Sequence, residues 1–217
     1  NKVIPSWAVI PLFTILAVNC LIYWGSSALT AGRYHFDFTM AFDREVPLLP
    51  VFVWFYILAF PFWAVGYLLA ARRGKDMFYR FVATDLTIHF ICFICFILIP
   101  TTNIRPEIPG NTLSEKILAL VYSLDGGNSP SNLFPSIHCY VSWMCWKGVE
   151  GSEKVPKWYQ RFSLVFAILI IISTQVLKQH YIVDAAAALL LVEFFWRFYQ
   201  KGQRHKWVVH VFAHKKK

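Results

Sequence analysis

Two long stretches of the chain carry no charged side chain. Residues 3–32 and 46–71 contain no Asp, Glu, Lys or Arg, and most of their side chains are apolar. The hydrocarbon core of a bilayer is about 30 Å thick, and a helix of roughly 20 apolar residues crosses it. Because both stretches reach that length, the sequence predicts an integral membrane protein and excludes an ordinary soluble domain.

The overall composition agrees with a membrane environment. Apolar residues make up 57% of the 217 and charged residues 15%, whereas soluble domains average about 45–50% and about 25%. The net charge of +9 does not indicate nucleic acid as a partner, because the basic residues lie at the ends of apolar segments and not on a soluble basic face. The five cysteines are an odd number, mostly within apolar runs, and predict no disulfide framework.

We predict an all-α fold: a single membrane domain over residues 1–217, built as a bundle of six transmembrane helices. The fourth helix is short, and the sixth contains Asp184 and Glu193. The chain has no internal repeat, and residues 200–217 form a basic tail that we expect to lie on the cytoplasmic membrane surface. The predicted spans cover residues at about 4–25, 46–71, 82–100, 136–149, 162–177 and 181–199.

The distribution of Lys and Arg orients the bundle. Basic residues favour the cytoplasmic side of a membrane, and with both termini inside, 16 of the 21 Lys and Arg residues fall on the inner side and 5 on the outer side. We therefore expect cytoplasmic termini, with segment 101–135 and the junction of spans five and six on the outer side. A short amphipathic helix is expected at 117–124, and residues 26–49 are typical of an interfacial helix and loop.

Ionisable side chains within membrane spans are costly and are therefore candidate functional residues. Asp184 follows His180 by four residues, so a helix would bring the two side chains together on one face. Such a carboxylate can fix the tautomer of the imidazole and stabilise its cation; the alternative is a purely structural hydrogen-bonded pair. His138 begins the fourth span on the same outer level as His180, where a lone histidine could instead be an interfacial residue bonded to water.

Two cations are expected near the same level. Arg105 and Lys178 are among the five outer basic residues, and their alternative role is ordinary snorkelling towards lipid headgroups. With the two histidines and the carboxylate they form a candidate site for an anion that needs no metal. The site would combine an oriented nucleophile, a second acid or base, and fixed positive charge.

These residues resemble the signature motifs of the type 2 phosphatidic acid phosphatase superfamily. Pro-Ser-Ile-His at 135–138 is similar to the second motif, and Arg105-Pro106 resembles the end of the first. The third motif is matched by Ser173-Thr174 followed by His180 and Asp184. The resemblance covers about residues 40–198, which we expect to be the motif-bearing core of the domain.

Three positions depart from the pattern of this superfamily. Ile137 stands in place of the usual Gly, Thr174 in place of Arg, and Leu98 in place of Lys. Lys178 lies four residues after Thr174, so it would occupy the helix face of the missing Arg if the helix continued through it. The resulting pattern resembles the branch that includes inositol phosphorylceramide synthase-like and sphingomyelin synthase-like proteins.

The resemblance implies a mechanism and a role for each matching residue. His180 would be the nucleophile that forms a phosphohistidine, with Asp184 orienting it. His138 would protonate the leaving oxygen and then activate the incoming water or alcohol. The phosphoryl oxygens would be held by Arg105, Lys178 and the backbone amides near Ser136. No metal and no cofactor are implied, and the lipid tail would enter laterally between helices.

The expected function is therefore that of an integral-membrane lipid phosphate phosphatase. This hydrolase would act on a lipid phosphate or diphosphate at the extracytoplasmic face of a bacterial plasma membrane, with surrounding lipids as its other partners. One alternative is a transferase that passes a phosphorylated headgroup from one lipid to the hydroxyl of another, because the same residues could perform that reaction. A second alternative is a non-enzymatic carrier or scaffold; the two missing cations favour it, and the retained His138, His180 and Asp184 argue against it.

Two further pairs of residues are expected to be structural. Cys92 and Cys95 form a CxxC pattern in the middle of the third span, but no second pair accompanies them, so packing is favoured over metal or redox chemistry. Asp85 and His89 are also four residues apart. We expect them at the inner end of the third span, far from the outer cluster.

Overall fold

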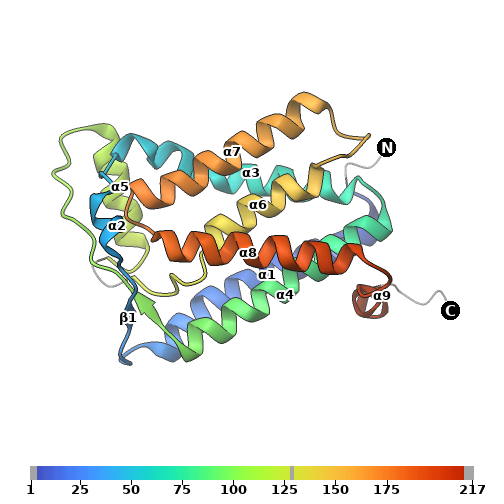
Figure 1. Ribbon diagram of the computed structural model, residues 1–217, viewed down its shortest axis with the longest axis horizontal. Helices are drawn as coiled ribbons and strands as arrows, with labels where there is room; N and C mark the ends of the chain where they lie inside the picture. Colours follow the sequence, from blue (N-terminus) through green and yellow to red (C-terminus); the bar gives the residue numbers. More distant parts are fainter. Residues whose placement is uncertain (1–3, 128–129, 213–217) are drawn as a thin grey trace.

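The computed structural model describes residues 4–127 and 130–212, and most of these residues are helical (Figure 1). A short parallel pair of strands, which the sequence did not predict, joins β1 (Phe36–Asp37) to β2 (Thr101–Thr102). The helices are α1 (Ser6–Thr30), α2 (Ala41–Glu45), α3 (Val53–Ala71, preceded by a 3-10 turn at Pro50–Phe52), α4 (Lys75–Leu98), α5 (Leu113–Leu124), α6 (Ile137–Val149), α7 (Lys157–Val176), α8 (Ile182–Gln200) and α9 (Lys206–Phe212).

Each of the six predicted spans overlaps one helix, namely α1, α3, α4, α6, α7 or α8. Within the described residues, four of these are long and apolar enough to cross a membrane: α1, α3 with its 3-10 turn, α4 and α7. The chain is therefore consistent with an integral membrane protein. The remaining two do not reach that standard, since α6 has only 13 residues and α8 carries Asp184, Glu193 and Arg197.

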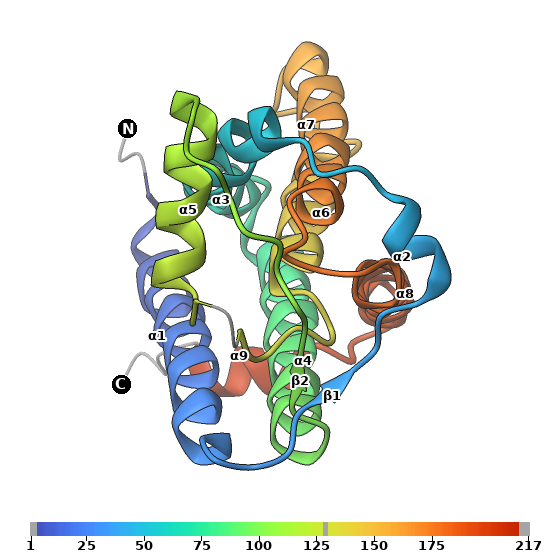
Figure 2. The same ribbon diagram turned by 90° about the vertical axis from the view of Figure 1, so that its left-hand side faces the viewer.

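The short helix α6 lies at the centre of the bundle, where it contacts α3, α4, α7 and α8 (Figure 2). Glycines allow this close packing: a Cβ on Gly66 would lie 2.6 Å from the Sγ of Cys145, and one on Gly148 would lie 2.9 Å from the Cβ of Ala70. Small residues of this kind let helix backbones approach closely in membrane bundles. Burial inside the bundle accounts for the length and polarity of α6, because this helix is surrounded by protein instead of lipid.

The connections that carry the candidate motifs gather at one end of the bundle. In Figure 1 β1, α2 and α5 lie together at the left, whereas α9 and the beginning of α1 lie at the right. The predicted amphipathic helix is present as α5, whose first turn is closed by Thr112 and Glu115: the hydroxyl of Thr112 accepts from the Glu115 amide, and the Glu115 carboxylate accepts from the Thr112 amide. This reciprocal capping fixes where α5 begins.

The Asp85–His89 pair lies in the middle of α4, because the helix begins several residues before the span predicted at 82–100. Helix α4 begins at Lys75, where an Asp76–Arg80 ion pair (2.8 Å) supports a polar first turn that the hydropathy pattern left out. The Nδ1 of His89 lies 3.0 Å from the Oδ2 of Asp85, and its Nε2 lies 2.7 Å from the hydroxyl of Tyr140 on α6. The pair therefore joins α4 to α6 inside the bundle.

Part of the predicted basic tail lies outside the described residues, because residues 213–217 are not among them. The described part forms α9, which is tied back to α4 by His205: its Nε2 lies 2.8 Å from the Oδ1 of Asp76. The tail thus packs against the bundle at least as far as Phe212.

Candidate functional site

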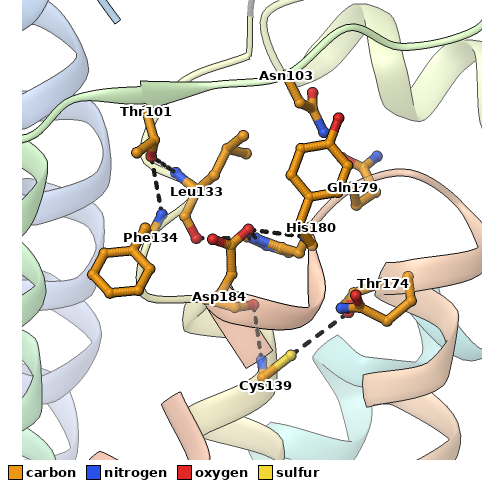
Figure 3. A network of polar contacts seen from close by, with 12 residues as sticks. Thr101, Asn103, Leu133, Phe134, Cys139, Thr174, Gln179, His180 and Asp184 are labelled. Atoms are coloured by element: carbon orange, nitrogen blue, oxygen red, sulfur yellow. Dashed lines mark hydrogen bonds and ion pairs between the residues drawn. The ribbon is translucent and has the colours of Figure 1, made fainter. Parts of the chain in front are cut away.

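His180 lies on the five-residue connection between α7 and α8, and Asp184 lies in the first turn of α8. The Nδ1 of His180 is 3.4 Å from the Oδ2 of Asp184 and 3.1 Å from the carbonyl oxygen of Leu133 (Figure 3). The predicted contact between His180 and Asp184 is present. The two residues do not share a helix face as predicted, because His180 precedes α8. Asp184 reaches back because its Oδ2 accepts a hydrogen bond from the Tyr181 amide (2.9 Å), which caps α8.

The orientation of the His180 ring follows from these partners. A carbonyl and a carboxylate can only accept hydrogen bonds, so Nδ1 must carry the hydrogen. The neutral imidazole then has its lone pair on Nε2. No described side chain or backbone group forms a hydrogen bond with Nε2, which leaves this nitrogen available to a substrate.

The backbone that faces His180 is fixed by the small sheet. The amides of Leu133 and Phe134 both donate to the hydroxyl of Thr101, each at 3.0 Å (Figure 3). Thr101 belongs to β2, which pairs with Phe36 of β1. The carbonyl that holds His180 is therefore positioned by two segments that lie far from it in the sequence.

His138 lies in the first turn of α6, with its ring centroid 6.0 Å from that of His180. The structure thus brings the two histidines to one place, although most of α6, all of α7 and the connection between them separate the two in the chain. Three aromatic side chains of α3 surround His138: Tyr56 stacks on it at 4.4 Å between centroids, Trp63 lies at 5.1 Å and Phe60 at 6.0 Å. The Nε2 of His138 is buried without a hydrogen-bond partner among the described residues.

Sequence reasoning missed the aromatic residues around His138. They lie at positions 56, 60 and 63, the spacing of one helix face, and this spacing in an apolar run was a signal that could have identified them. Trp63 is held in place because its indole nitrogen donates to the hydroxyl of Ser142 (2.8 Å), one turn beyond His138 on α6. The rings therefore restrict the position of the imidazole from three sides.

Ser136 caps the beginning of α6. Its hydroxyl accepts a hydrogen bond from the Cys139 amide (3.3 Å), and its own amide donates to the carbonyl oxygen of Asp184 (3.2 Å). The second bond joins the two motifs that carry His138 and His180. The amides of Ile137 and His138 form no hydrogen bond with a described residue, as expected in the first turn of a helix, where an anion can bind.

Arg105 is 5% exposed and lies beside the His180 connection. Its guanidinium donates to the carboxylate of Asp125, to the side-chain oxygen of Gln179, and to the carbonyls of Asp125 (2.9 Å) and Gly127 (3.1 Å). It also lies over the ring of Tyr122, 4.7 Å from the centroid. Arg105 therefore carries a positive charge to the site, and Asp125 partly neutralises it.

Asp125 and Gln179 are site residues that the sequence did not reveal. Asp125 follows α5 at the start of a Gly-rich run, and Gln179 lies between the motif residues Thr174 and His180. The hydroxyl of Tyr23 on α1 also donates to Asp125. Burial raises the pKa of Tyr122 to about 12, so this residue stays a neutral hydrogen-bond donor to the carbonyl oxygen of Leu177 (2.6 Å).

The expectation that Lys178 lies on the same helix face as Thr174 is wrong. Helix α7 ends at Val176, and Lys178 has a φ of +53°, a left-handed conformation that cannot continue a right-handed helix. Its ammonium group donates to the carbonyl oxygens of Asp43 (2.8 Å) and Val46. Burial lowers the pKa of Lys178, and the nearby charge of Asp43 opposes that shift.

The two cysteines of the CxxC pattern lie away from these residues in α4, where Cys92 is buried and Cys95 is partly buried. Replacing Cys92 by Ser is expected to leave the turnover per folded molecule unchanged. The hydroxyl would be buried in apolar surroundings and should lower the melting temperature, because burying it costs about 1–3 kcal/mol. Turnover and thermal unfolding of the purified variant test this, and a large loss of turnover at unchanged stability would give the thiol a chemical role.

The chain was compared with known families and proteins. The family model of the PAP2 superfamily matches residues 32–197. No curated protein and no solved structure gives a significant match. The matched segment begins after α1 and contains every residue that the motif comparison selected, from Arg105 to Asp184. Because this match covers well over half of the 217 residues, the chain belongs to the PAP2 superfamily, that of the type 2 phosphatidic acid phosphatases.

Proposed function

We propose that the protein is a lipid phosphate phosphatase that acts through a phosphohistidine at His180. The observation that carries this proposal is the pairing of an oriented imidazole with a second histidine. The Nδ1 of His180 contacts Leu133 and Asp184, and its Nε2 forms no hydrogen bond with a described residue. The ring of His138 lies 6.0 Å away. Membership in the PAP2 superfamily supports the same class of chemistry.

The first half-reaction would transfer the phosphoryl group to the protein. The lone pair of His180 Nε2 attacks phosphorus, an N–P bond forms, and the bond between phosphorus and the lipid oxygen breaks. His138 supplies a proton to that oxygen as it leaves. Asp184 stabilises the positive charge that develops on the His180 ring, because its carboxylate faces Nδ1.

The second half-reaction would release phosphate. His138, now neutral, takes a proton from a water molecule, which attacks phosphorus while the N–P bond breaks. The 6.0 Å between the two ring centroids would place His138 beside the phosphohistidine. With a phosphodiester lipid as donor, His180 would carry the phosphorylated headgroup, and an alcohol in place of water would accept it in the same step, which is headgroup transfer.

The phosphoryl oxygens need positive charge and hydrogen-bond donors. We assign the hydrogen-bond donors to the first turn of α6, where Ser136 caps the helix and the amides of Ile137 and His138 form no hydrogen bond with a described residue. Arg105 supplies positive charge, and its Nε is a buried donor without a partner among the described residues. Lys178 contributes to the electrostatic field of the site, but its ammonium group is occupied by two carbonyls. We place the site at the extracytoplasmic face, in accord with the distribution of basic residues along the chain.

The proposal is tested by phosphate release from purified protein in detergent with EDTA, across a panel of lipid phosphates and diphosphates. We expect release from at least one lipid in EDTA, and none from the His180→Ala variant. Equal release by this variant would contradict the mechanism. If the wild type releases no phosphate but transfers labelled headgroup to an alcohol, the transferase replaces the phosphatase; if it does neither, the protein is not an enzyme of this class.

A further inference from the structure

The catalytic connection, Leu177–Tyr181, joins α7 to α8, and both helices pack on α6. Within the connection, the amides of Gln179 and His180 both donate to the carbonyl oxygen of Thr174, at 2.9 and 3.0 Å. A histidine that must aim one nitrogen at phosphorus needs further support, because small displacements of a reacting group are costly.

That support comes from residues 43–49, which precede α3 in the chain. The Leu49 amide donates to the carbonyl oxygen of Val176 (2.9 Å), before the connection. The Ile182 amide donates to the Oδ1 of Asp43 (2.9 Å), after it. In the middle, the ammonium group of Lys178 donates to the carbonyls of Asp43 (2.8 Å) and Val46. Segment 43–49 therefore contacts the chain on both sides of His180.

Asp43 makes the most specific of these contacts. It is 4% exposed, and both oxygens of its carboxylate are used, since Oδ2 accepts from the Met40 amide (2.8 Å) while Oδ1 accepts from Ile182. The Ile182 amide lies in the first turn of α8, where a negative charge is favourable. Asp184 uses the neighbouring amide of Tyr181. Two carboxylates thus fix the point at which the connection becomes a helix.

The backbone conformation of Lys178 explains why the Leu177–Tyr181 connection needs support from segment 43–49. A φ of +53° is disfavoured for a residue with a β-carbon, and such a conformation persists only when its surroundings enforce it. The two carbonyls of segment 43–49 hold the side chain, and the side-chain nitrogen of Asn103 donates to the backbone carbonyl of Lys178 (2.9 Å). The left-handed turn places Gln179 and His180 against Arg105 and Leu133.

We propose that Asp43 is a positioning residue for the nucleophile: with Lys178 it fixes the Leu177–Tyr181 connection so that His180 Nε2 faces the phosphoryl group. This role rests on the proposed function, because it assumes that His180 reacts with phosphorus. Asp43 does not touch the substrate and acts through the backbone at Ile182 and through Lys178.

The test compares Asp43→Asn with Glu45→Gln. Both residues lie in α2 and both changes remove one negative charge, but Glu45 is exposed and its carboxylate forms no hydrogen bond or ion pair with a described residue. In Asp43→Asn the new amide group must face one of two backbone N–H donors, so one hydrogen bond is lost. We expect kcat for lipid phosphate to fall about tenfold to a hundredfold in Asp43→Asn. KM should stay within about twofold, because the phosphate contacts themselves are unchanged, and Glu45→Gln should behave as the wild type.

Lys178 gives a second variant, in case Asp43→Asn does not fold. Lys178→Met should lower kcat in the same way, and Lys178→Arg should restore most of it, because a guanidinium can donate to the same two carbonyls. Replacement of Lys116, an exposed lysine of α5, by Met is the matched control. All variants are measured beside the wild type, with the melting temperature and the rate of phosphoenzyme formation recorded for each.

Each result has a definite meaning. Slower phosphoenzyme formation at unchanged KM, in protein that remains folded, supports the positioning role. Unchanged kcat in folded Asp43→Asn or folded Lys178→Met, or a loss that only follows a lower melting temperature, overturns it and leaves the proposed function intact. A wild type that neither releases nor transfers phosphate overturns the proposed function, and the positioning role fails with it.

Discussion

Replacing His180 by Ala is expected to lower phosphate release by at least about 10³-fold, to the background of the assay. The imidazole supplies the bond-forming nitrogen, and loss of a nucleophile in an interacting group of catalytic residues removes most of the rate enhancement. A loss of this size corresponds to about 4 kcal/mol of transition-state stabilisation. Initial rates with the best lipid phosphate, measured at equal concentrations of folded protein, give the result.

A histidine elsewhere at the same end of the molecule provides the control. His35 follows α1, and among the described residues its ring bonds only to the carbonyl oxygen of Arg33 (Nδ1, 2.9 Å). His35→Ala should therefore keep the wild-type rate within about twofold. Substantial turnover by His180→Ala would mean that another group attacks phosphorus, and equal losses in both variants would point to a general effect on folding.

Replacing His138 by Ala is expected to lower kcat by about 10²- to 10⁴-fold, the usual contribution of a general acid or base. The effect should depend on the leaving group, because His138 protonates the oxygen that leaves. An aryl phosphate with an acidic phenol needs no proton at that step, so its conversion to the phosphoenzyme should be much less impaired than that of a lipid phosphate. Rapid-quench measurement of both substrates separates the two half-reactions.

The aromatic residues around His138 provide a control for its surroundings. Phe60→Leu keeps an apolar side chain beside the imidazole, whose ring lies 6.0 Å from that of Phe60. This variant should retain most of the turnover with both substrates. If His138→Ala were as harmful with the aryl phosphate as with the lipid, His138 would have a structural role instead of donating a proton.

Most of the helices could be predicted from the sequence because an apolar run of membrane length is a local property. The sequence did not predict the surroundings of helix α6. This helix is short and contains His138, yet it lies at the centre of the bundle. Its placement depends on close contacts with Gly66 and Ala70 of α3, and the sequence alone does not pair these positions. The beginning of α4 was missed because its first turns are polar and are supported by ion pairs.

The reacting residues of the candidate site could be selected from the sequence, whereas their supports could not. His138, His180 and Asp184 stand out because ionisable groups are rare in apolar segments. Asp43 and Asp125 lie in polar parts of the sequence, where a carboxylate is common and does not indicate a site. Only in the folded chain does Asp43 contact Ile182 and Asp125 contact Arg105. The prediction that Lys178 replaces the missing Arg assumed that the helix continues through Lys178. The chain instead makes a left-handed turn at this residue.

The central claim, nucleophilic attack by His180, is tested most directly by trapping the phosphoenzyme. The protein is mixed with a lipid phosphate labelled at phosphorus and quenched in alkali, in which phosphohistidine persists, and the labelled residue is then identified by peptide mapping. We predict acid-labile label on His180 in the wild type and none in His180→Ala. In His138→Ala an aryl phosphate labelled at phosphorus should give more label than in the wild type, because this substrate forms the phosphoenzyme without a proton from His138 and the intermediate is then hydrolysed slowly. Label on a different residue, or turnover by His180→Ala without any label, would contradict the account.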